Sequence, residues 1–420
     1  MATSRIEITA PGEYQLLKDD QPFFIKGAGV EFGSLEALAA AGGNCFRTWR
    51  VNNGQRPVLD ILDEAHSLGL VVVMGLDLER ERHGFDYSDP KAVAEQKAAV
   101  MADVERLKDH PALLMWGLGN ELNLRATDDA VWDAVEDLAK AIKAVDPDHL
   151  VSTMLAGIEA PAVKAIKQRA PSIDLLSFQI YGAIDQLSKH LSKADYDGPY
   201  MLTEWGPTGH WESPSTKWGR PIEPCSHEKA KDIGRRYRDI ILKQKHRCLG
   251  SFVFLWGQKQ ERTSTWYGLF LERGTRTEAV DILSEAWTGE PPMNPVPVIK
   301  QLRLDGRSAK KSVTAKADTE ICAELTVDTQ RNKVHFVTWV IREELEPSLQ
   351  SDGGDLEPVP PIVDWFAGTN ATEYRFSVKE PGEYRLFCEV SDNFDGSAVA
   401  NIPFLVTASS NGTSTIKSTD

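Results

Sequence analysis

Two glutamates, Glu121 and Glu204, directly follow short apolar runs, where ordinary core packing would place no charge. Residues 113–122 read LLMWGLGNEL and residues 200–206 read YMLTEWG. An apolar run that ends at a glycine or turn is typical of a buried strand leaving its sheet. Because carboxylates are rarely buried without a partner, these two positions indicate acid–base or nucleophilic chemistry. A helix cap or a salt bridge remains the alternative reading of Glu121 on this stretch alone.

Hydrolysis of a glycosidic bond requires two carboxyl groups that flank the bond. One group protonates the leaving oxygen, and the other attacks the anomeric carbon or activates a water molecule. A separation of about 5 Å gives retention of configuration, and about 6.5–9.5 Å gives inversion. Sequence does not measure this separation, so both outcomes stay open at this point.

Alternating strand and helix patterns are the elements that must bring Glu121 and Glu204 together. The apolar strand-like runs lie at 23–27, 45–49, 71–76, 113–118, 150–154, 175–180, 200–203 and 251–255. Amphipathic helical patterns lie at 35–41, 58–68, 89–108, 128–145, 160–169, 228–245 and 277–287, with a weaker one at 183–197. Eight such units over roughly 230 residues predict an α/β fold, a (β/α)8 TIM barrel, with an open doubly wound sheet as the alternative. Active sites of such barrels lie at the carboxyl ends of the strands, which would place both glutamates at one mouth.

A change of pattern after residue 289 indicates a second domain. We expect a catalytic barrel with an N-terminal β-hairpin at 1–289, a proline-rich linker at 290–298, an immunoglobulin-like β-sandwich at 299–407 and a disordered tail at 408–420. The expected strands of the sandwich lie at 299–304, 312–317, 323–328, 334–341, 372–378, 382–390 and 398–406. We interpret this sandwich as a packing or spacer module rather than a glycan-binding one.

Composition restricts the classes of partner. The chain has 420 residues, 41% of them hydrophobic, and a formal net charge of -15, which argues against nucleic acid or an anionic membrane surface as a partner. No run approaches the length of a membrane-spanning helix.

The five cysteines lack metal-ligand spacing, so we expect free or buried thiols and no zinc site, while a Cys322–Cys388 pair stays open. Residues 1–7 lack a signal-like pattern, so the protein is expected to be either secreted or periplasmic with its signal absent from this sequence, or cytoplasmic.

The motifs together resemble the clan A glycoside hydrolases, the retaining (β/α)8-barrel group that includes families two and five. The matching residues are Phe24-Ile-Lys-Gly27, Asn44-Cys-Phe-Arg47, Gly119-Asn120-Glu121, Tyr181, Thr203-Glu204-Trp205-Gly206 and Trp256, in the family's order along residues 23–287. The resemblance implies Glu204 as the nucleophile and Glu121 as the general acid/base of a retaining β-glycoside hydrolase. It implies no metal and no organic cofactor, and its substrate would be a β-linked glucan, oligosaccharide or glycoside.

Further roles follow from the same resemblance. Asn120 would bind the sugar 2-hydroxyl, and Arg47 and Tyr181 would keep Glu204 ionised. Trp256 would form the apolar floor under the reacting sugar. The residues expected to bind substrate are Arg47, Trp49, Asn120, Tyr181, Trp205, His210 and Trp256. Structural roles remain the alternative: ion pairing for Arg47, core hydrogen bonding for Tyr181, packing for the outer tryptophans, and an ordinary loop position for His210.

Other functions stay open beside hydrolysis. A transglycosylase would use the same site with a second sugar in place of water. A non-catalytic carbohydrate-binding barrel is disfavoured because it would have no use for two costly carboxylates. A metal-assisted lyase or isomerase would gather carboxylates from adjacent strands around one ion, whereas Glu121 and Glu204 follow strands three apart.

Overall fold

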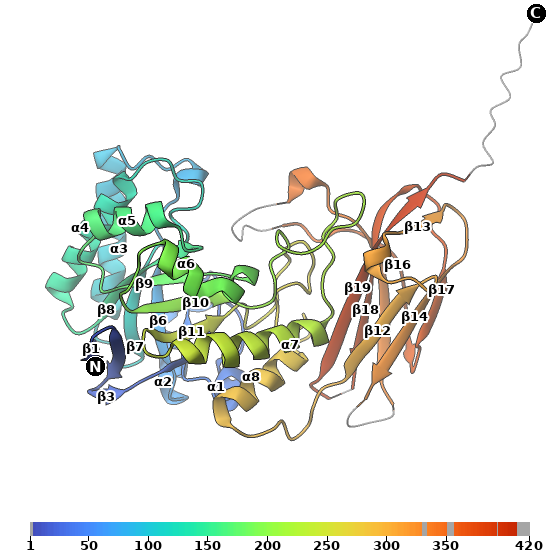
Figure 1. The fold of residues 1–420 in the computed structure, drawn as a ribbon, viewed down its shortest axis with the longest axis horizontal. Coiled ribbons are helices and arrows are strands. Elements are labelled where there is room, and N and C mark those ends of the chain that lie inside the picture. Colours follow the sequence, from blue (N-terminus) through green and yellow to red (C-terminus); the bar gives the residue numbers. More distant parts are fainter. Residues whose placement is uncertain (1–2, 330–333, 351–356, 393, 410–420) are drawn as a thin grey trace, which may run out of the picture.

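The chain folds into a closed parallel β-barrel followed by a two-sheet β domain (Figure 1), in a computed structural model that describes residues 3–329, 334–350, 357–392 and 394–409. The barrel strands succeed one another in chain order, and the last pairs with the first. They are β4 (Ile25–Gly29), β5 (Cys45–Arg47), β6 (Val71–Leu76), β7 (Leu113–Leu118), β8 (Leu150–Ala156), β9 (Leu175–Gln179), β10 (Tyr200–Trp205) and β11 (Cys248–Val253). Closure confirms the TIM barrel and rules out the open doubly wound sheet.

Helices surround the barrel at the positions that the amphipathic patterns predicted. They are α1 (Leu35–Ala40), α2 (Val58–Ser67), α3 (Pro90–Leu107), α4 (Ala130–Val145), α5 (Ala160–Arg169), α6 (Leu187–Lys193), α7 (Ser226–Arg236) and α8 (Glu278–Thr288). The weaker pattern at 183–197 is a 3-10 turn, Gly182–Gln186, followed by the short α6. The pattern at 228–245 begins earlier, at Ser226, and continues past α7 as a π turn over Tyr237–Ile241.

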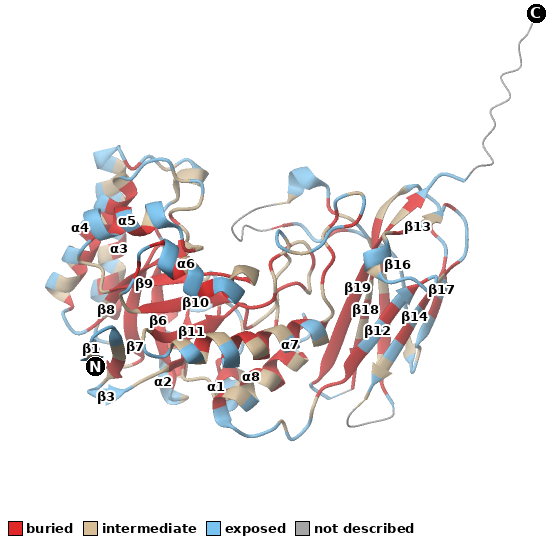
Figure 2. Ribbon diagram, in the orientation of Figure 1, coloured by how far each residue is buried: buried red, intermediate tan, exposed pale blue. Residues whose placement is uncertain are grey.

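Two apolar layers, inside and outside the strands, hold the barrel together. Side chains alternate between the two faces of each strand. Those facing inward form a separate cluster that includes Ile25, Cys45, Val73, Met115, Met154 and Met201. Those facing outward pack under the helices, and Figure 2 shows buried strands beneath helices whose outer faces are exposed. This alternation decides which residue at each strand end can reach the mouth of the barrel.

The N-terminal hairpin closes the end of the barrel opposite the mouth. Strands β1 (Ser4–Ala10) and β2 (Glu13–Lys18) form an antiparallel sheet with the short β3 (Gln21–Pro22). Leu16 packs into the inner cluster, and the Tyr14 backbone N–H donates to the carbonyl oxygen of His246, just before β11 begins. The hairpin therefore leaves the carboxyl ends of the strands open.

The C-terminal domain is a sandwich of two sheets. One sheet joins β12 (Val298–Leu304), β14 (Ile321–Asp328) and β17 (Glu373–Phe376); the other joins β13 (Val313–Lys316), β19 (Ser397–Thr407), β18 (Gly382–Ser391), β15 (Phe336–Glu343) and β16 (Ile362–Thr369). Seven of these strands match the expected ones, but β16 was missed. It lies at a sheet edge with most of its side chains exposed, so it lacks the alternation that marks a half-buried strand.

The remaining general predictions concern thiols, membranes and the tail. All five cysteines are free, so the possible Cys322–Cys388 pair does not form. Among the described residues, no helix is long and apolar enough to cross a membrane. Residues 410–420 of the expected tail lie outside the described residues.

Candidate active site

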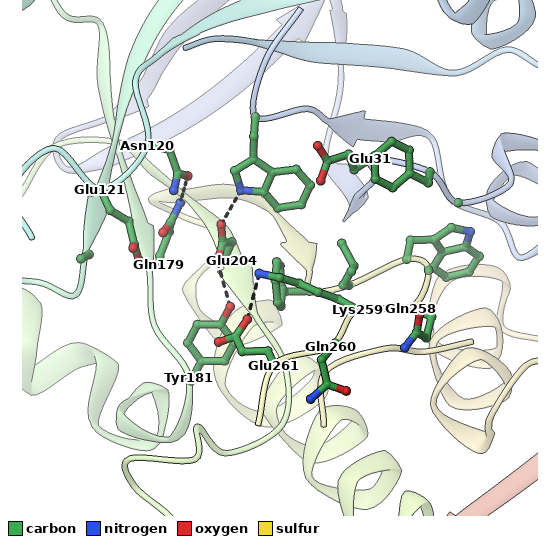
Figure 3. Close-up of a pocket in the computed structure, with 18 of the residues that line it drawn as sticks. Glu31, Asn120, Glu121, Gln179, Tyr181, Glu204, Gln258, Lys259, Gln260 and Glu261 are labelled. Carbon is green, nitrogen blue, oxygen red and sulfur yellow. Dashed lines mark hydrogen bonds and ion pairs between the residues drawn. The ribbon is translucent and has the colours of Figure 1, made fainter. Parts of the chain in front are cut away.

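A cavity of about 1480 Å³ opens at the carboxyl ends of the barrel strands (Figure 3). It is lined by Asn120 and Glu121 just after β7, by Gln179 at the end of β9 and Tyr181 just after it, and by Glu204 on β10. Pockets for small molecules usually measure about 300–1,000 Å³, so this one has room for more than a single sugar ring. Both carboxylates of interest thus project into one compartment, as Figure 3 shows.

The carboxylate of Glu204 is buried and accepts hydrogen bonds on both oxygens. Trp49 Nε1 donates to Oε1 at 2.8 Å and the hydroxyl of Tyr181 donates to Oε2 at 2.8 Å. The guanidinium of Arg47 lies 3.4 Å from Oε1 and supplies a buried positive charge. Donors on each side fix the plane of the carboxylate, and Arg47 compensates its negative charge.

Arg47 also connects three strand ends. Its Nη1 donates to the backbone carbonyl oxygen of Thr203 at 3.1 Å, and its Nη2 donates to Oδ1 of Asn120 at 2.8 Å. The guanidinium further lies over the Trp49 ring, 4.7 Å from its centroid. The planar fork of arginine suits such a position, because several fixed donors can serve different acceptors at once.

The amide of Asn120 is oriented by two donors. Its Oδ1 accepts from Arg47 and also from Nε2 of Gln179 at 2.6 Å. Because the oxygen is engaged, the Nδ2 group is the end of Asn120 that can donate to a substrate hydroxyl. Gln179 is a site residue that sequence reasoning missed. The available signal was its place as a polar residue near the end of the strand-like run 175–180, and in the barrel it pairs in register with Glu204.

Glu121 sits in a strained turn that neighbouring groups hold in place. Its φ is 53°, in the left-handed region that non-glycine residues rarely adopt. Its N–H donates to the carbonyl oxygen of Met154 at 3.0 Å, and Arg82 Nη1 donates to its carbonyl oxygen at 2.8 Å. Arg80 Nε likewise donates to the carbonyl oxygen of Asn120 at 3.1 Å. Strain of this kind persists where surrounding contacts over-determine the backbone, often at functional sites.

The surroundings of Glu121 favour its protonated form. Burial raises the pKa of its carboxyl to about 8, and the negative charges of Glu204 and Glu261 act in the same direction, against Arg82. A carboxyl group with this pKa is largely protonated at neutral pH and can donate a proton. Trp116 and Trp205 do not contribute to this burial, because both belong to the outer layer between the strands and the helices.

Trp205 does not lie where its sequence-based role requires, whereas the role of Trp256 as the floor under the sugar stays a prediction. Trp205 follows Glu204 on β10, so alternation turns it outward, where it is fully buried and stacks on Tyr237 at 5.9 Å between centroids. It is not among the residues that line the cavity. Trp256 does border the cavity, but its indole is buried, donates to the carbonyl oxygen of Ser34 at 3.0 Å and stacks on Trp287.

His210 lies in the cavity wall. Its Nδ1 is 2.8 Å from the hydroxyl of the buried Tyr267, and its backbone N–H donates to the same oxygen at 3.2 Å. The adjacent Trp211 is 60% exposed and meets Tyr181 edge to face at 5.4 Å between centroids. An exposed indole on a cavity wall is suited to stacking on a sugar ring.

Lys259 and Glu261 complete the wall and were not singled out from the sequence. They belong to the segment 256–267, which is rich in polar and aromatic residues. Lys259 Nζ lies 2.9 Å from Oε2 of Glu261, as Figure 3 shows, and burial raises the pKa of the Glu261 carboxyl. Among the described residues, no three His, Cys, Asp or Glu side chains cluster as a metal site would require.

Comparison with known proteins shows that part of the barrel is similar to glycoside hydrolases. Residues 55–215 match the family described as glycosyl hydrolases family 2, TIM barrel domain. The chain is 30% identical over 138 residues to mannan endo-1,4-beta-mannosidase 7 of Oryza sativa subsp. japonica, which covers 26% of this chain and 36% of that protein. The corresponding figures for mannan endo-1,4-beta-mannosidase F of Aspergillus clavatus are 34% identity over 68 residues, and 16% of each chain.

Solved structures extend the likeness of fold. Beta-glucuronidase of Bacteroides uniformis is 13% identical, with a TM-score of 0.52. The alignment covers 97% of this chain and 48% of the glucuronidase chain. Beta-glucuronidase of Bifidobacterium dentium is 16% identical, with a TM-score of 0.54, and covers 69% of this chain and 50% of its own. The chain thus spans about half the length of these enzymes. The match over residues 55–215 and the closed barrel confirm that this chain resembles the clan A glycoside hydrolases, and the matched residues resemble a family 2 TIM-barrel domain.

Proposed function

We propose that the protein is a retaining β-glycoside hydrolase that acts by double displacement, with Glu204 as nucleophile and Glu121 as general acid/base. One observation carries the proposal: two glutamates project into the same cavity in opposite environments. Glu204 is surrounded by donors and a cation, whereas burial raises the pKa of Glu121 to about 8. Two carboxyl groups whose environments separate them in this way are suited to acid and nucleophile roles.

In the first step, a carboxylate oxygen of Glu204 attacks the anomeric carbon and forms a glycosyl ester. The bond to the leaving oxygen breaks, and that oxygen receives the proton of Glu121. The hydrogen bonds from Trp49 and Tyr181 hold the carboxylate of Glu204 in one plane during the attack. Asn120 donates through Nδ2 to the sugar 2-hydroxyl, a contact that strengthens as the oxocarbenium-like transition state develops.

In the second step, Glu121, now ionised, removes a proton from water as the water attacks the anomeric carbon. The ester bond to Glu204 breaks, the sugar leaves with its original configuration, and Glu121 is protonated again. Two inversions at the same carbon give net retention.

The substrate class is a β-linked glucan, oligosaccharide or glycoside. Both curated relatives are named as mannan endo-1,4-beta-mannosidases, which supports a neutral β-linked hexose and makes mannosides an early choice for assay. The cavity volume and the exposed Trp211 favour a chain of sugars over a single ring. The same features favour transglycosylation as the second candidate, because a sugar held beside Trp211 can replace water as acceptor.

The test is a screen of aryl β-glycosides and β-linked polysaccharides, with the first-formed product followed by proton NMR. A β-anomer as the initial product supports double displacement. An initial α-anomer, or turnover only with α-glycosides, would contradict it. Added acceptor sugars distinguish transglycosylation, since longer products then form at the expense of free sugar.

A further inference from the structure

The segment after β11 forms one wall of the cavity and turns its other side toward the C-terminal sandwich. Residues 256–261 line the cavity, including Lys259 and Glu261. Residues 262–265 continue the same segment and make their polar contacts behind the wall, with groups of α7, the loop before it and the sandwich. We call residues 256–267 the wall segment.

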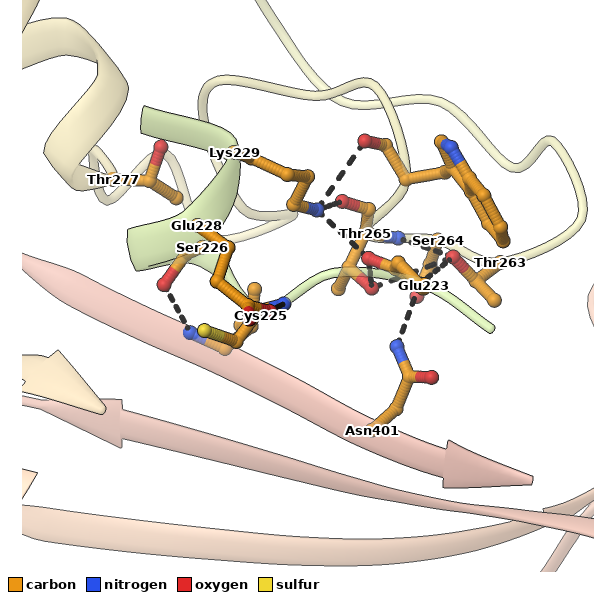
Figure 4. Close-up of polar contacts among 12 residues, drawn as sticks. Glu223, Cys225, Ser226, Glu228, Lys229, Thr263, Ser264, Thr265, Thr277 and Asn401 are labelled. Carbon is orange, nitrogen blue, oxygen red and sulfur yellow. Dashed lines mark hydrogen bonds and ion pairs between the residues drawn. The ribbon is translucent and has the colours of Figure 1, made fainter. Parts of the chain in front are cut away.

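Glu223 is the centre of these contacts (Figure 4). Its carboxylate is buried and accepts from four side chains. Oε1 accepts from Lys229 Nζ at 2.8 Å and from Thr265 Oγ1 at 2.9 Å. Oε2 accepts from Thr263 Oγ1 at 2.6 Å and from Nδ2 of Asn401, a residue of strand β19, at 2.6 Å. One carboxylate therefore joins the barrel, the wall segment and the sandwich.

Lys229 adds backbone contacts to the same cluster. Its buried Nζ donates to the carbonyl oxygens of Thr265 at 2.5 Å and Trp266 at 3.2 Å. The ammonium group thus compensates the charge of Glu223 and fixes the path of the wall segment. A buried ion pair with its remaining positions hydrogen-bonded is costly to disturb, because removal of one member leaves a charge unpaired.

A second contact comes from the sandwich directly. Glu357, whose side chain is fully buried, accepts from the backbone N–H of Arg262 at 2.6 Å and forms an ion pair with the Arg262 guanidinium. Arg262 has φ 60° and directly follows Glu261. The carboxylate therefore braces an unfavourable backbone conformation one residue from the cavity wall.

We propose that the C-terminal sandwich is a positioning element of the substrate cavity: through Glu357 and Asn401 it holds the wall segment so that Lys259 and Glu261 can bind substrate. The inference rests on the proposed glycosidase function and goes beyond the packing or spacer role expected from the sequence. Glu357 and Asn401 are positioning residues, since they act through Arg262 and Glu223.

The contacts of Glu204 separate substrate binding from nucleophilic attack in this scheme, while the charge of Glu261 acts on the pKa of Glu121, so the kinetics are compared below pH 7, where Glu121 stays protonated. Glu204 is held by Arg47, Trp49 and Tyr181, none of which belongs to the wall segment. A displaced wall should therefore weaken substrate binding more than it slows bond cleavage, so KM should change more than kcat.

The test compares two alanine substitutions. Each replaces a glutamate of the sandwich that pairs with an arginine of the barrel domain. Glu357→Ala removes the partner of Arg262, and Glu383→Ala, the matched control, removes the partner of Arg220, outside the wall segment. Hydrogen exchange of residues 256–267 and the kinetics on a hydrolysed glycoside are measured for both. Glu357→Gln, which keeps the size and one acceptor oxygen, is the milder variant in case Glu357→Ala does not fold.

We expect Glu357→Ala to speed exchange in the wall segment and to raise KM about tenfold with kcat within about threefold, while Glu383→Ala leaves both near wild type. Glu357→Gln should lie between the two. Equal exchange and equal KM in both alanine variants would overturn the proposal. Exchange does not depend on turnover, so a wild-type protein without glycosidase activity would count against the proposed function and not against the positioning role.

Discussion

The hydroxyl of Tyr181 lies 2.8 Å from Oε2 of Glu204 and joins the ends of neighbouring strands β9 and β10. Trp49, from the far side of the barrel mouth, binds the other oxygen at 2.8 Å. The carboxylate is thereby held from two directions, with its plane fixed before substrate arrives. Such preorganisation reduces the reorganisation that the attack on an anomeric carbon would otherwise require.

Replacement of the proposed nucleophile should abolish turnover. Glu204→Gln keeps the shape of the side chain but cannot form the glycosyl ester, so kcat on an activated aryl glycoside should fall by about three to five orders of magnitude. Glu159→Gln is the control, because Glu159 is an exposed glutamate of the same cavity. A Glu204→Gln enzyme with the wild-type rate would remove Glu204 from the mechanism.

The dependence of activity on pH should report Glu121. Its pKa is raised to about 8, so it keeps the proton needed for leaving-group departure below that pH and loses it above. Initial rates from pH 5 to 10 should therefore show kcat/KM falling as pH rises through about 8. Glu261→Gln removes a neighbouring negative charge and should move the alkaline limb of the pH profile to lower pH. Arg82→Gln removes a positive charge and should move the same limb to higher pH. A limb unmoved by both changes would contradict the assignment.

Two tryptophans offer a matched comparison. Trp49→Phe removes the indole donor to Glu204, and kcat/KM should fall by about tenfold to a hundredfold, since a hydrogen bond to a charged group contributes about 1.5–3 kcal/mol. Trp205→Phe changes a buried indole outside the cavity and should lower thermal stability without altering kcat/KM beyond about twofold. The reverse pattern, measured by kinetics and thermal unfolding, would show that the two placements are misjudged.

The amide of Asn120 should act through the sugar 2-hydroxyl. Asn120→Ala should reduce kcat/KM about a hundredfold on an ordinary aryl glycoside but only a few-fold on the 2-deoxy analogue, which lacks the partner. Gln179→Leu removes one of the two donors that orient Asn120 and should give a smaller loss with the same substrate preference. Equal losses on both substrates would indicate that Asn120 is structural.

Much of the barrel could be predicted because its strands are continuous apolar runs. The stretches between these runs carry the apolar periodicity of amphipathic helices. The runs 71–76 and 113–118 coincide with β6 and β7 to the residue. Strand β16 could not be found in this way, because its side chains are mostly exposed and carry no alternation. The start of α7 at Ser226 was also missed, since the first turn is set by a capping box at Cys225 and not by an apolar stripe.

The site was less predictable than the fold. Sequence placed Glu121 and Glu204 at strand ends, and the cavity receives both. The prediction that Trp205 binds substrate was wrong, because adjacent residues of a strand face opposite sides. With Glu204 facing the cavity, Trp205 must face the helices. Gln179, Lys259 and Glu261 depend on which loops and strand ends meet in space, which no local pattern reports.

The most direct measurement is the configuration of the product that Glu204→Gly forms with azide from a hydrolysed aryl β-glycoside. With the nucleophile removed, azide should occupy the space that the carboxylate leaves and attack the anomeric carbon once. We expect azide to restore turnover and to give the α-glycosyl azide, identified by proton NMR, while Glu121→Ala with azide gives the β-anomer. A β-glycosyl azide from Glu204→Gly, or a Glu204→Gly enzyme whose rate matches wild type without azide, would contradict double displacement through Glu204.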